Sequence, residues 1–255
     1  MATQLPILKV SASSLKTYQQ CPRKYYFTYI DKQPKKEWGH LELGNFVHGV
    51  LEDFHNQLQE DPRTPDEWGQ LLTSICKVER EKYNLTPEHR IKARDMLKAY
   101  LEILKSEGLP SVLFNEKSFN IKLNEGLLIR GFIDRIDTDP DRGYHILDYK
   151  TGASRYLDDF QLLIYGIYLL NEHPELERFK ASYLILAEGS KLMSYTFTQT
   201  DVQRAVQKII NIASQIREDK TWTPKPQFLC SYCDFQAICP VTLREQQFKN
   251  TAGWE

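Results

Sequence analysis

The stretch "GFIDRID" at residues 131–137, followed by "ILDYKTG" at residues 146–152, has the pattern of two strands that carry charged side chains. Side chains two residues apart in a strand point to the same face, so Asp148 and Lys150 share one face. Asp134 stands among apolar neighbours in the first stretch. A carboxylate in an apolar strand costs free energy unless a partner compensates its charge. The two stretches therefore predict an organised charged site.

The spacing of these charged residues in the sequence is consistent with two interpretations. One is a salt bridge between Lys150 and an aspartate. The other is a Mg²⁺ site, because Mg²⁺ prefers hard oxygen ligands and keeps several waters. A bound ion would lower the pKa of a water and screen the charge of a phosphodiester. The lysine would then orient that water or stabilise the charge that develops on the phosphate.

Helical periodicity dominates the first half of the chain, and strands alternate with helices in the second half. The predicted helices cover residues 11–30 (with a break before Pro22), 41–58, 66–84, 86–107, 156–170 and 200–219, the last with Thr200 as N-cap. Strands are predicted in 118–137, 144–152, 181–189 and 192–198, with turns at Asn124–Gly126 and Glu188–Gly189. This alternation predicts an α/β fold, in which a mixed central sheet is flanked by helices behind a helical N-terminal portion.

Three polar residues on apolar helices are further candidates for the site. His48 follows Gly44 by one helical turn, and Gln161 and Tyr165 are also one turn apart, directly after the strand of Asp148. A lone histidine is usually structural, but a neutral imidazole also binds divalent ions. The polar ends of Gln161 and Tyr165 need partners, which hydrogen bonds in the core, the lysine or a nucleic-acid backbone would supply.

Composition places the chain among ordinary globular proteins. Of 255 residues, 41% are hydrophobic and 26% are charged, with a net charge of −1. No apolar run has the length of a membrane span, and "MATQLPILKV" lacks the pattern of a signal peptide, so we expect a cytoplasmic protein. Between Lys16 and Lys36, basic residues alternate with aromatic ones. That mixture is typical of a nucleic-acid surface, but also of a helix with aromatic residues in the core and lysines in solvent.

Cysteines gather near the end of the chain, in "LCSYCDFQAICP" at residues 229–240. Cys230, Cys233 and Cys239 supply three ligands, whereas a closed metal site or a cubane cluster takes four. Cys76 stands alone in a helical pattern, where we expect it to be buried as a small apolar residue.

These motifs together resemble the RecB-type branch of the PD-(D/E)XK nuclease superfamily, over about residues 11 to 240. The resemblance rests on four motifs in the family's order: Gly44 to His48, "GFIDRID", "DYKTG", and Gln161 to Tyr165. It implies a restriction-endonuclease-like core and a role for each motif residue. His48, Asp134, Asp148 and the backbone carbonyl of Tyr149 would bind Mg²⁺ or Mn²⁺, Lys150 would be the catalytic lysine, and Gln161 and Tyr165 would position DNA and the active-site strand. Glu116 is a further acidic candidate.

A subset of these nucleases, which includes AddB-type proteins and CRISPR-associated four-cysteine nucleases, carries an iron–sulfur cluster. The family holds it by one upstream and three downstream cysteines. The resemblance thus makes Cys21, which precedes Pro22, the fourth ligand of a [4Fe-4S] cluster with Cys230, Cys233 and Cys239. Such a C-terminal Fe–S clasp would tie the two ends of the chain together. A four-cysteine zinc site is the alternative.

The expected activity is that of a metal-dependent DNA nuclease, an exonuclease that acts on single-stranded ends in DNA repair or recombination. Arg23, Lys24, Tyr25, Gln161 and Tyr165 are the expected DNA contacts, and a helicase or a CRISPR-adaptation protein is the expected partner. One alternative is a CRISPR-adaptation nuclease that trims DNA before its integration, and another is a non-catalytic DNA-binding scaffold. We expect a single nuclease domain over 1–255, with a helical portion (11–110), a nuclease core (111–220) and a cluster-binding tail (221–240).

Overall fold

The computed structural model describes residues 6–36, 39–139 and 143–241. These residues form two compact units. The first, called the terminal unit here, takes its described residues from within 1–37, 122–129 and 207–255, and the second, called the central unit, takes them from 38–121 and 130–206.

The terminal unit contains segments from both ends of the chain. Its elements are β1 (Leu8–Val10), α1 (Ala12–Gln20), α2 (Pro22–Tyr25), a π-helical turn (Tyr26–Ile30), the start of β3 (Leu127–Asp139), the end of α7 (Gln199–Glu218) and a 3₁₀ turn (Phe228–Tyr232). β1 pairs in parallel with the first residues of β3. Ser11 and Ser14 form a capping box at the start of α1, and Pro22 takes the first position of α2, where its missing N–H has no helical partner to lose.

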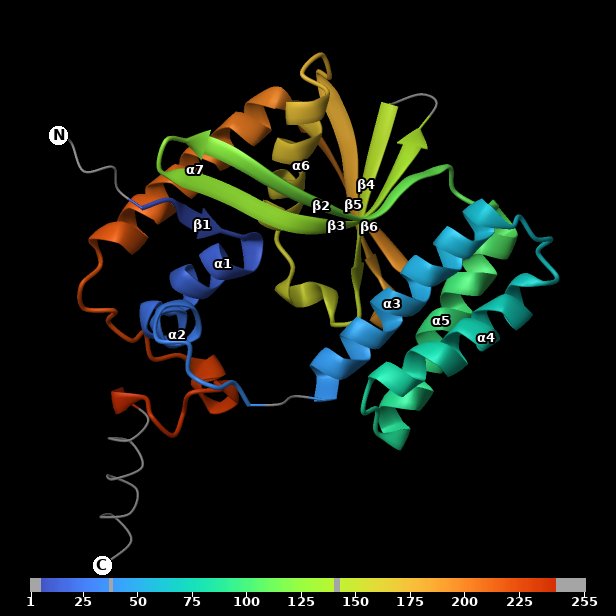
Figure 1. The fold of residues 1–255 in the computed structure, drawn as a ribbon, viewed down its shortest axis with the longest axis horizontal. Coiled ribbons are helices and arrows are strands. Elements are labelled where there is room, and N and C mark those ends of the chain that lie inside the picture. The colour runs from blue at the N-terminus through green and yellow to red at the C-terminus, as the bar shows by residue number, and fades with distance from the viewer. Residues whose placement is uncertain (1–5, 37–38, 140–142, 242–255) are drawn as a thin grey trace, which may run out of the picture. The chain divides into compact units, whose positions relative to one another are not determined.

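The central unit is built on a mixed sheet (Figure 1). Its strands are most of β2 (Val112–Asn124) and of β3, together with β4 (Gly143–Lys150), β5 (Arg178–Ile185) and β6 (Lys191–Thr198). β3, β4, β5 and β6 lie side by side in this order, and β2 pairs with β3. The β3–β4 and β5–β6 pairs are antiparallel, whereas β4 and β5 run parallel.

The unit also contains the helices α3 (Gly39–Glu60), α4 (Trp68–Glu79), α5 (Pro87–Glu107) and α6 (Phe160–Glu172). Of these, α6 contacts β4 and β5, and α4 and α5 both pack on α3. Figure 1 shows α3, α4 and α5 close together, and their apolar stripes share one buried core with Tyr149, Leu184 and Leu186 of the sheet side. The apolar spacing of their sequences accounts for this core. The predicted α/β class, with a mixed central sheet flanked by helices, is confirmed. None of the helices in the described residues is both long and apolar enough to cross a membrane.

Both predicted hairpin turns are confirmed, but the start of α7 was predicted wrongly. The helix begins at Gln199, ahead of the predicted cap Thr200. The Thr198 N–H donates to Asp201 Oδ2 over 2.8 Å, and the Asp201 N–H donates to Thr198 Oγ1 over 3.3 Å. This reciprocal pair closes at Thr198, with Asp201 three residues after it, so Thr198 is the cap.

Candidate active site

The site forms where β3 and β4 separate. Their antiparallel ladder extends to the pair Arg135–Leu147, and the next residues along the two strands are Asp134 and Asp148. The backbone N–H of Tyr149 donates to Asp134 Oδ2 over 2.6 Å. A side chain thus satisfies a backbone donor at the point where the strands diverge, and this hydrogen bond holds the Asp134 carboxylate against β4.

One group of three metal-ligating side chains lies beside this point. His48 from α3, Glu116 from β2 and Asp134 from β3 offer ligand atoms that all lie within 4.8 Å of one another. His48 Nδ1 is 3.4 Å from Asp134 Oδ2. The backbone of Glu116 has a φ of 45°, a left-handed conformation that is rare for a residue other than glycine and concentrates at functional sites.

The carboxylates of the site raise the pKa values of the titratable groups beside them. Burial alone would lower the pKa of His48, but the carboxylates of Asp134, Asp148 and Glu116 outweigh it and raise that pKa to about 9. Burial, followed by the charge of Asp134, raises the pKa of Glu116 to about 7. Burial and the charge of Asp134 also raise the pKa of Asp148 to about 6, against the opposing effect of Lys150. The group therefore carries an excess of negative charge that a cation would relieve.

A second group, on the α6 side, holds the predicted acid and lysine of β4. The side chain of Asp148 is 2% exposed and forms an ion pair with Lys150. Gln161 bonds to both, because its Nε2 donates to Asp148 Oδ1 over 2.8 Å and its Oε1 accepts from Lys150 Nζ over 3.0 Å. Tyr165 donates its hydroxyl to the same Asp148 oxygen over 2.9 Å. Both side chains from α6 thus orient the acid and the lysine.

A buried network lies on the opposite face of the same strands, and sequence reasoning missed it. The Nη1 group of Arg135 contacts Tyr100, Tyr149 and His55, whose side chains come from α5, β4 and α3. Asp137 forms the ion pair of this guanidinium, with Nε 2.9 Å from Oδ1. The network fixes the side chain of Tyr149, whose backbone bonds to Asp134. Its sequence signal was present, since Arg135 and Asp137 alternate with Asp134 in an apolar strand.

The donor set of the first group fits a divalent cation. Two carboxylates and one imidazole are within reach of a common point, and Asp148 raises the pKa of His48 through its charge. Carboxylate oxygens suit Mg²⁺ and Mn²⁺, and imidazole is a frequent additional ligand of the transition metal. Asp148 is not a member of the group within 4.8 Å, and its oxygens bond to Lys150, Gln161 and Tyr165.

Two of the residues expected to contact DNA are buried and bonded within the protein. Tyr25 is 2% exposed, and its ring stacks on Trp222 with centroids 5.8 Å apart, so it has no free face for a base. Tyr165 is 5% exposed, and its hydroxyl is engaged with Asp148. Arg23 donates to the carbonyl of Thr221 over 3.1 Å, within the terminal unit.

The four predicted cluster ligands lie in the terminal unit. Cys21, Cys230, Cys233 and Cys239 all line one small cavity of about 60 Å³. Burial raises the pKa of Cys233. No three of these sulfur atoms come within 4.8 Å of one another in the described part of the chain. Four thiols around one cavity fit a thiolate-bound group. Cys76 lies in the central unit and is half-buried.

The alignments with curated relatives cover most of this chain but only a small part of each relative's own length. A subunit of the ATP-dependent helicase/deoxyribonuclease of Clostridium perfringens is 28% identical, over 66% of this chain and 18% of its own length. The subunit of the same name from Streptococcus pyogenes is 26% identical, over 76% of this chain and 20% of its own. The chain therefore spans about a fifth of the length of these relatives.

Fold and family comparisons agree with this similarity. The crystal structure of a candidate exonuclease from Eubacterium rectale superposes with a TM-score of 0.52 at 16% identity, covering 88% of this chain and 86% of the other, which shows a shared fold. Residues 9–240 match the family described as the PD-(D/E)XK nuclease superfamily. The chain belongs to the PD-(D/E)XK nuclease superfamily.

Proposed function

We propose that this protein is a metal-dependent DNA nuclease, an exonuclease that hydrolyses phosphodiester bonds at single-stranded ends in DNA repair or recombination. One observation carries the proposal: a His–Glu–Asp group stands next to a buried Asp–Lys pair that two side chains of α6 orient. Membership in the nuclease superfamily and the deoxyribonuclease name of the relatives support DNA as the substrate.

The residues of the first group would bind the metal ion in this proposal. His48, Glu116 and Asp134 would hold Mg²⁺ or Mn²⁺, with Asp148 and the carbonyl of Tyr149 as further ligands. When bound, such an ion polarises the scissile phosphate and lowers the pKa of a water. The carboxylates repel a phosphodiester until a cation compensates them, which makes substrate binding dependent on metal.

Lys150 would orient the attacking water and stabilise the negative charge that develops on the phosphate. Its partner Gln161 fixes the ammonium group through Oε1 while it fixes Asp148 through Nε2. A single amide therefore sets the spacing between the acid and the lysine. Such pre-orientation lowers the cost of arranging groups in the transition state. Gln161 and Tyr165 act in this proposal as positioning residues, and Arg23 and Lys24 are kept as DNA contacts of the terminal unit.

End-labelled DNA, single- and double-stranded, tests the proposal in the presence and absence of Mn²⁺. Lys150→Ala should lower the cleavage rate by about a hundredfold or more, while DNA binding is kept. Lys105→Ala, an exposed lysine of α5 that pairs with Glu102, is the matched control and should cleave normally. Equal cleavage by the wild type and Lys150→Ala would refute the assignment of the site.

The same assay separates the alternatives expected from the sequence. Terminal labels released as mononucleotides support the exonuclease, whereas products of one uniform length favour trimming before integration in CRISPR adaptation. DNA binding without any cleavage favours the non-catalytic scaffold. The helicase/nuclease name of the relatives leads us to propose a helicase partner, and we propose that both units act as a single nuclease domain.

We also propose that Cys21, Cys230, Cys233 and Cys239 bind a [4Fe-4S] cluster. Support comes from the four thiols that line one cavity, three from the C-terminal segment and one from the N-terminal segment. Iron and sulfide analysis of anaerobically purified protein, together with its visible absorbance, tests this. Cys76→Ala should keep the iron and Cys233→Ala should lose it. A colourless protein loaded with zinc would contradict the cluster.

A further inference from the structure

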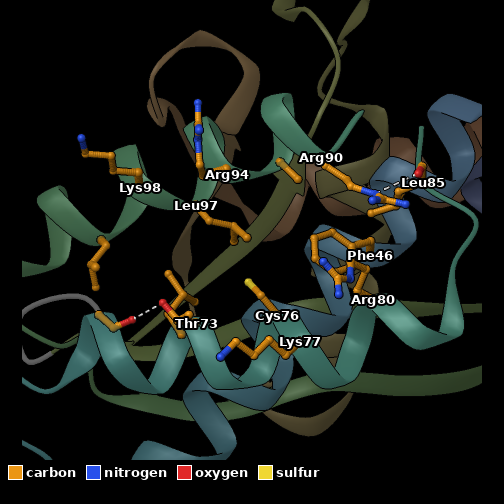
Figure 2. A pocket seen from close by; sticks show the side chains of 14 residues that line it. Phe46, Thr73, Cys76, Lys77, Arg80, Leu85, Arg90, Arg94, Leu97 and Lys98 are labelled. Atoms are coloured by element: carbon orange, nitrogen blue, oxygen red, sulfur yellow. Dashed lines mark hydrogen bonds between the residues drawn. The ribbon is translucent and has the colours of Figure 1, made fainter. Parts of the chain in front are cut away.

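A groove in the central unit lies apart from the residues assigned to the nuclease site. It encloses about 460 Å³ between α4 and α5, and Phe46 of α3 contributes to its floor. Both helices pack on α3, and Figure 2 shows Cys76 and Leu97 pointing into the space between them. The lining is aliphatic in the middle, with Leu72 and Leu101 beside these residues. We call it the α4–α5 groove.

Positive charges line both edges of the α4–α5 groove. Arg90, Arg94 and Lys98 follow one another at intervals of four residues along α5, a single row of about 12 Å. Lys77 and Arg80 form the opposite row, three residues apart. All five side chains are exposed at the edges of an apolar floor. This arrangement is complementary to an apolar stripe with acidic residues on both sides.

The pairing of the lysines on α5 distinguishes the groove edge from the rest of the helix. Lys92 forms an ion pair with Glu88 at 2.7 Å, and Lys105 with Glu102 at 3.9 Å. Among the residues that the structure describes, Lys77 and Lys98 form no ion pair, whereas Arg94 in the same row is paired with Asp95 at 3.0 Å. The uncompensated lysine charge at the groove therefore comes from Lys77 of α4 and Lys98 of α5.

We propose that the α4–α5 groove binds an acidic amphipathic helix of a partner protein. An amphipathic helix places an apolar stripe into a groove by residues at i, i+3, i+4 and i+7, and its flanking acids would meet the two cationic rows. Helices α3, α4 and α5 then form a four-helix arrangement with the guest. Nucleic acid fits the floor less well, because single strands stack their bases on exposed aromatic rings. Phe46 is the floor's aromatic residue and is 5% exposed.

A guest helix in the groove would touch the helix that supplies a proposed metal ligand. Phe46 lies two residues before His48 on α3. Contact at the floor would thus bear on the part of α3 that positions the imidazole. The groove proposal stands independently of the nuclease proposal, because its charges and its floor are not site residues.

The test uses the full chain and a synthetic peptide of about 18 residues, or about 27 Å as a helix. The peptide carries leucines at i, i+3, i+4 and i+7, glutamates on both sides of that stripe, a fluorophore and a photo-cross-linker. A second peptide replaces every glutamate by lysine, and a single-stranded oligonucleotide is the third probe. Fluorescence anisotropy measures affinity, and mass spectrometry maps the cross-links.

Two matched double variants change the net charge equally. Lys77→Glu/Lys98→Glu reverses one lysine on each edge, and Lys92→Glu/Lys105→Glu reverses two lysines of α5 outside the groove. Circular dichroism verifies that both fold. We expect the acidic peptide to bind, to cross-link within residues 68–107, and to lose about tenfold or more in affinity only in the first variant.

Four results would overturn the proposal. These are an acidic peptide that does not bind, a lysine peptide that binds as well, equal effects of the two variants, and cross-links outside the groove. If the protein does not bind the acidic peptide but binds the oligonucleotide, and Lys77→Glu/Lys98→Glu weakens that binding, the groove is a nucleic-acid surface instead. If the protein cleaves DNA but does not bind the acidic peptide, the groove proposal fails and the proposed nuclease function stands. The failure of one proposal can therefore be distinguished from the failure of the other.

Discussion

Metal binding at the proposed site should release a proton from His48. The pKa of this imidazole is raised to about 9, so at pH 8 the group is about nine-tenths protonated and must lose that proton to donate a nitrogen to a metal. Glu116, with a pKa of about 7, is then about nine-tenths ionised and adds about a tenth of a proton. The sum predicts about one proton released per Mn²⁺ at pH 8.

Calorimetric titration with Mn²⁺ in two buffers of different ionisation enthalpy measures that number directly. The apparent affinity should rise about tenfold or more between pH 7 and pH 8, and level off above the pKa of the imidazole. In His48→Ala the release at pH 8 should fall to a few tenths of a proton at most. The control is His173→Ala, because that imidazole stacks on Tyr144 and is not in the metal group.

The result that would refute this reasoning is specific. If the wild type binds Mn²⁺ with no proton release at pH 8, the imidazole is either neutral beforehand or not a ligand. If His48→Ala releases as many protons as the wild type, another group titrates. In both cases the assignment of His48 as a protonated ligand of the metal-free protein is wrong.

The remaining predictions concern stability. Arg135→Met should cost about 3–5 kcal/mol in urea unfolding, because it leaves the Asp137 carboxylate buried without its ion pair; a loss below about 1 kcal/mol would contradict the network. Gly166→Ala should lower the free energy of unfolding by about 1–3 kcal/mol, since its new methyl group overlaps the ring of Phe179. In the control Gly44→Ala, the new methyl group meets only the hydroxyl of Thr151 at 3.4 Å, so we expect no loss of stability. Equal effects of the two substitutions would contradict this packing. In the metal-free protein, the folded state holds the imidazole proton more tightly than the unfolded chain, so the melting temperature should fall as the pH rises from about 6.5 to about 9, and a flat profile would be inconsistent with the raised pKa.

The local pattern of the sequence was enough to predict most elements of the fold. Period-two and helical apolar spacing depend on residues a few positions apart, and both hairpins and the helices α3 to α6 follow from them. The prediction that Asp148 and Lys150 share one face of a strand is also local, because it depends only on the alternation of side chains along the strand. The cap of α7 was missed, since Thr198 and Thr200 each have a side chain three residues on that fits a capping box, and only the folded chain shows which pair forms.

Tertiary structure alone decided which distant side chains meet. Glu116 joins His48 and Asp134 from a third element and through a left-handed backbone, for which its own neighbours in sequence give no signal. Tyr25 looked like a stacking platform but is buried against Trp222, nearly 200 positions away. Such contacts depend on how elements pack and align over long separations, whereas periodicity reports only which face of one element is apolar. The chemical character of the site residues could therefore be predicted from the sequence, whereas the contacts between distant residues could be found only in the folded chain.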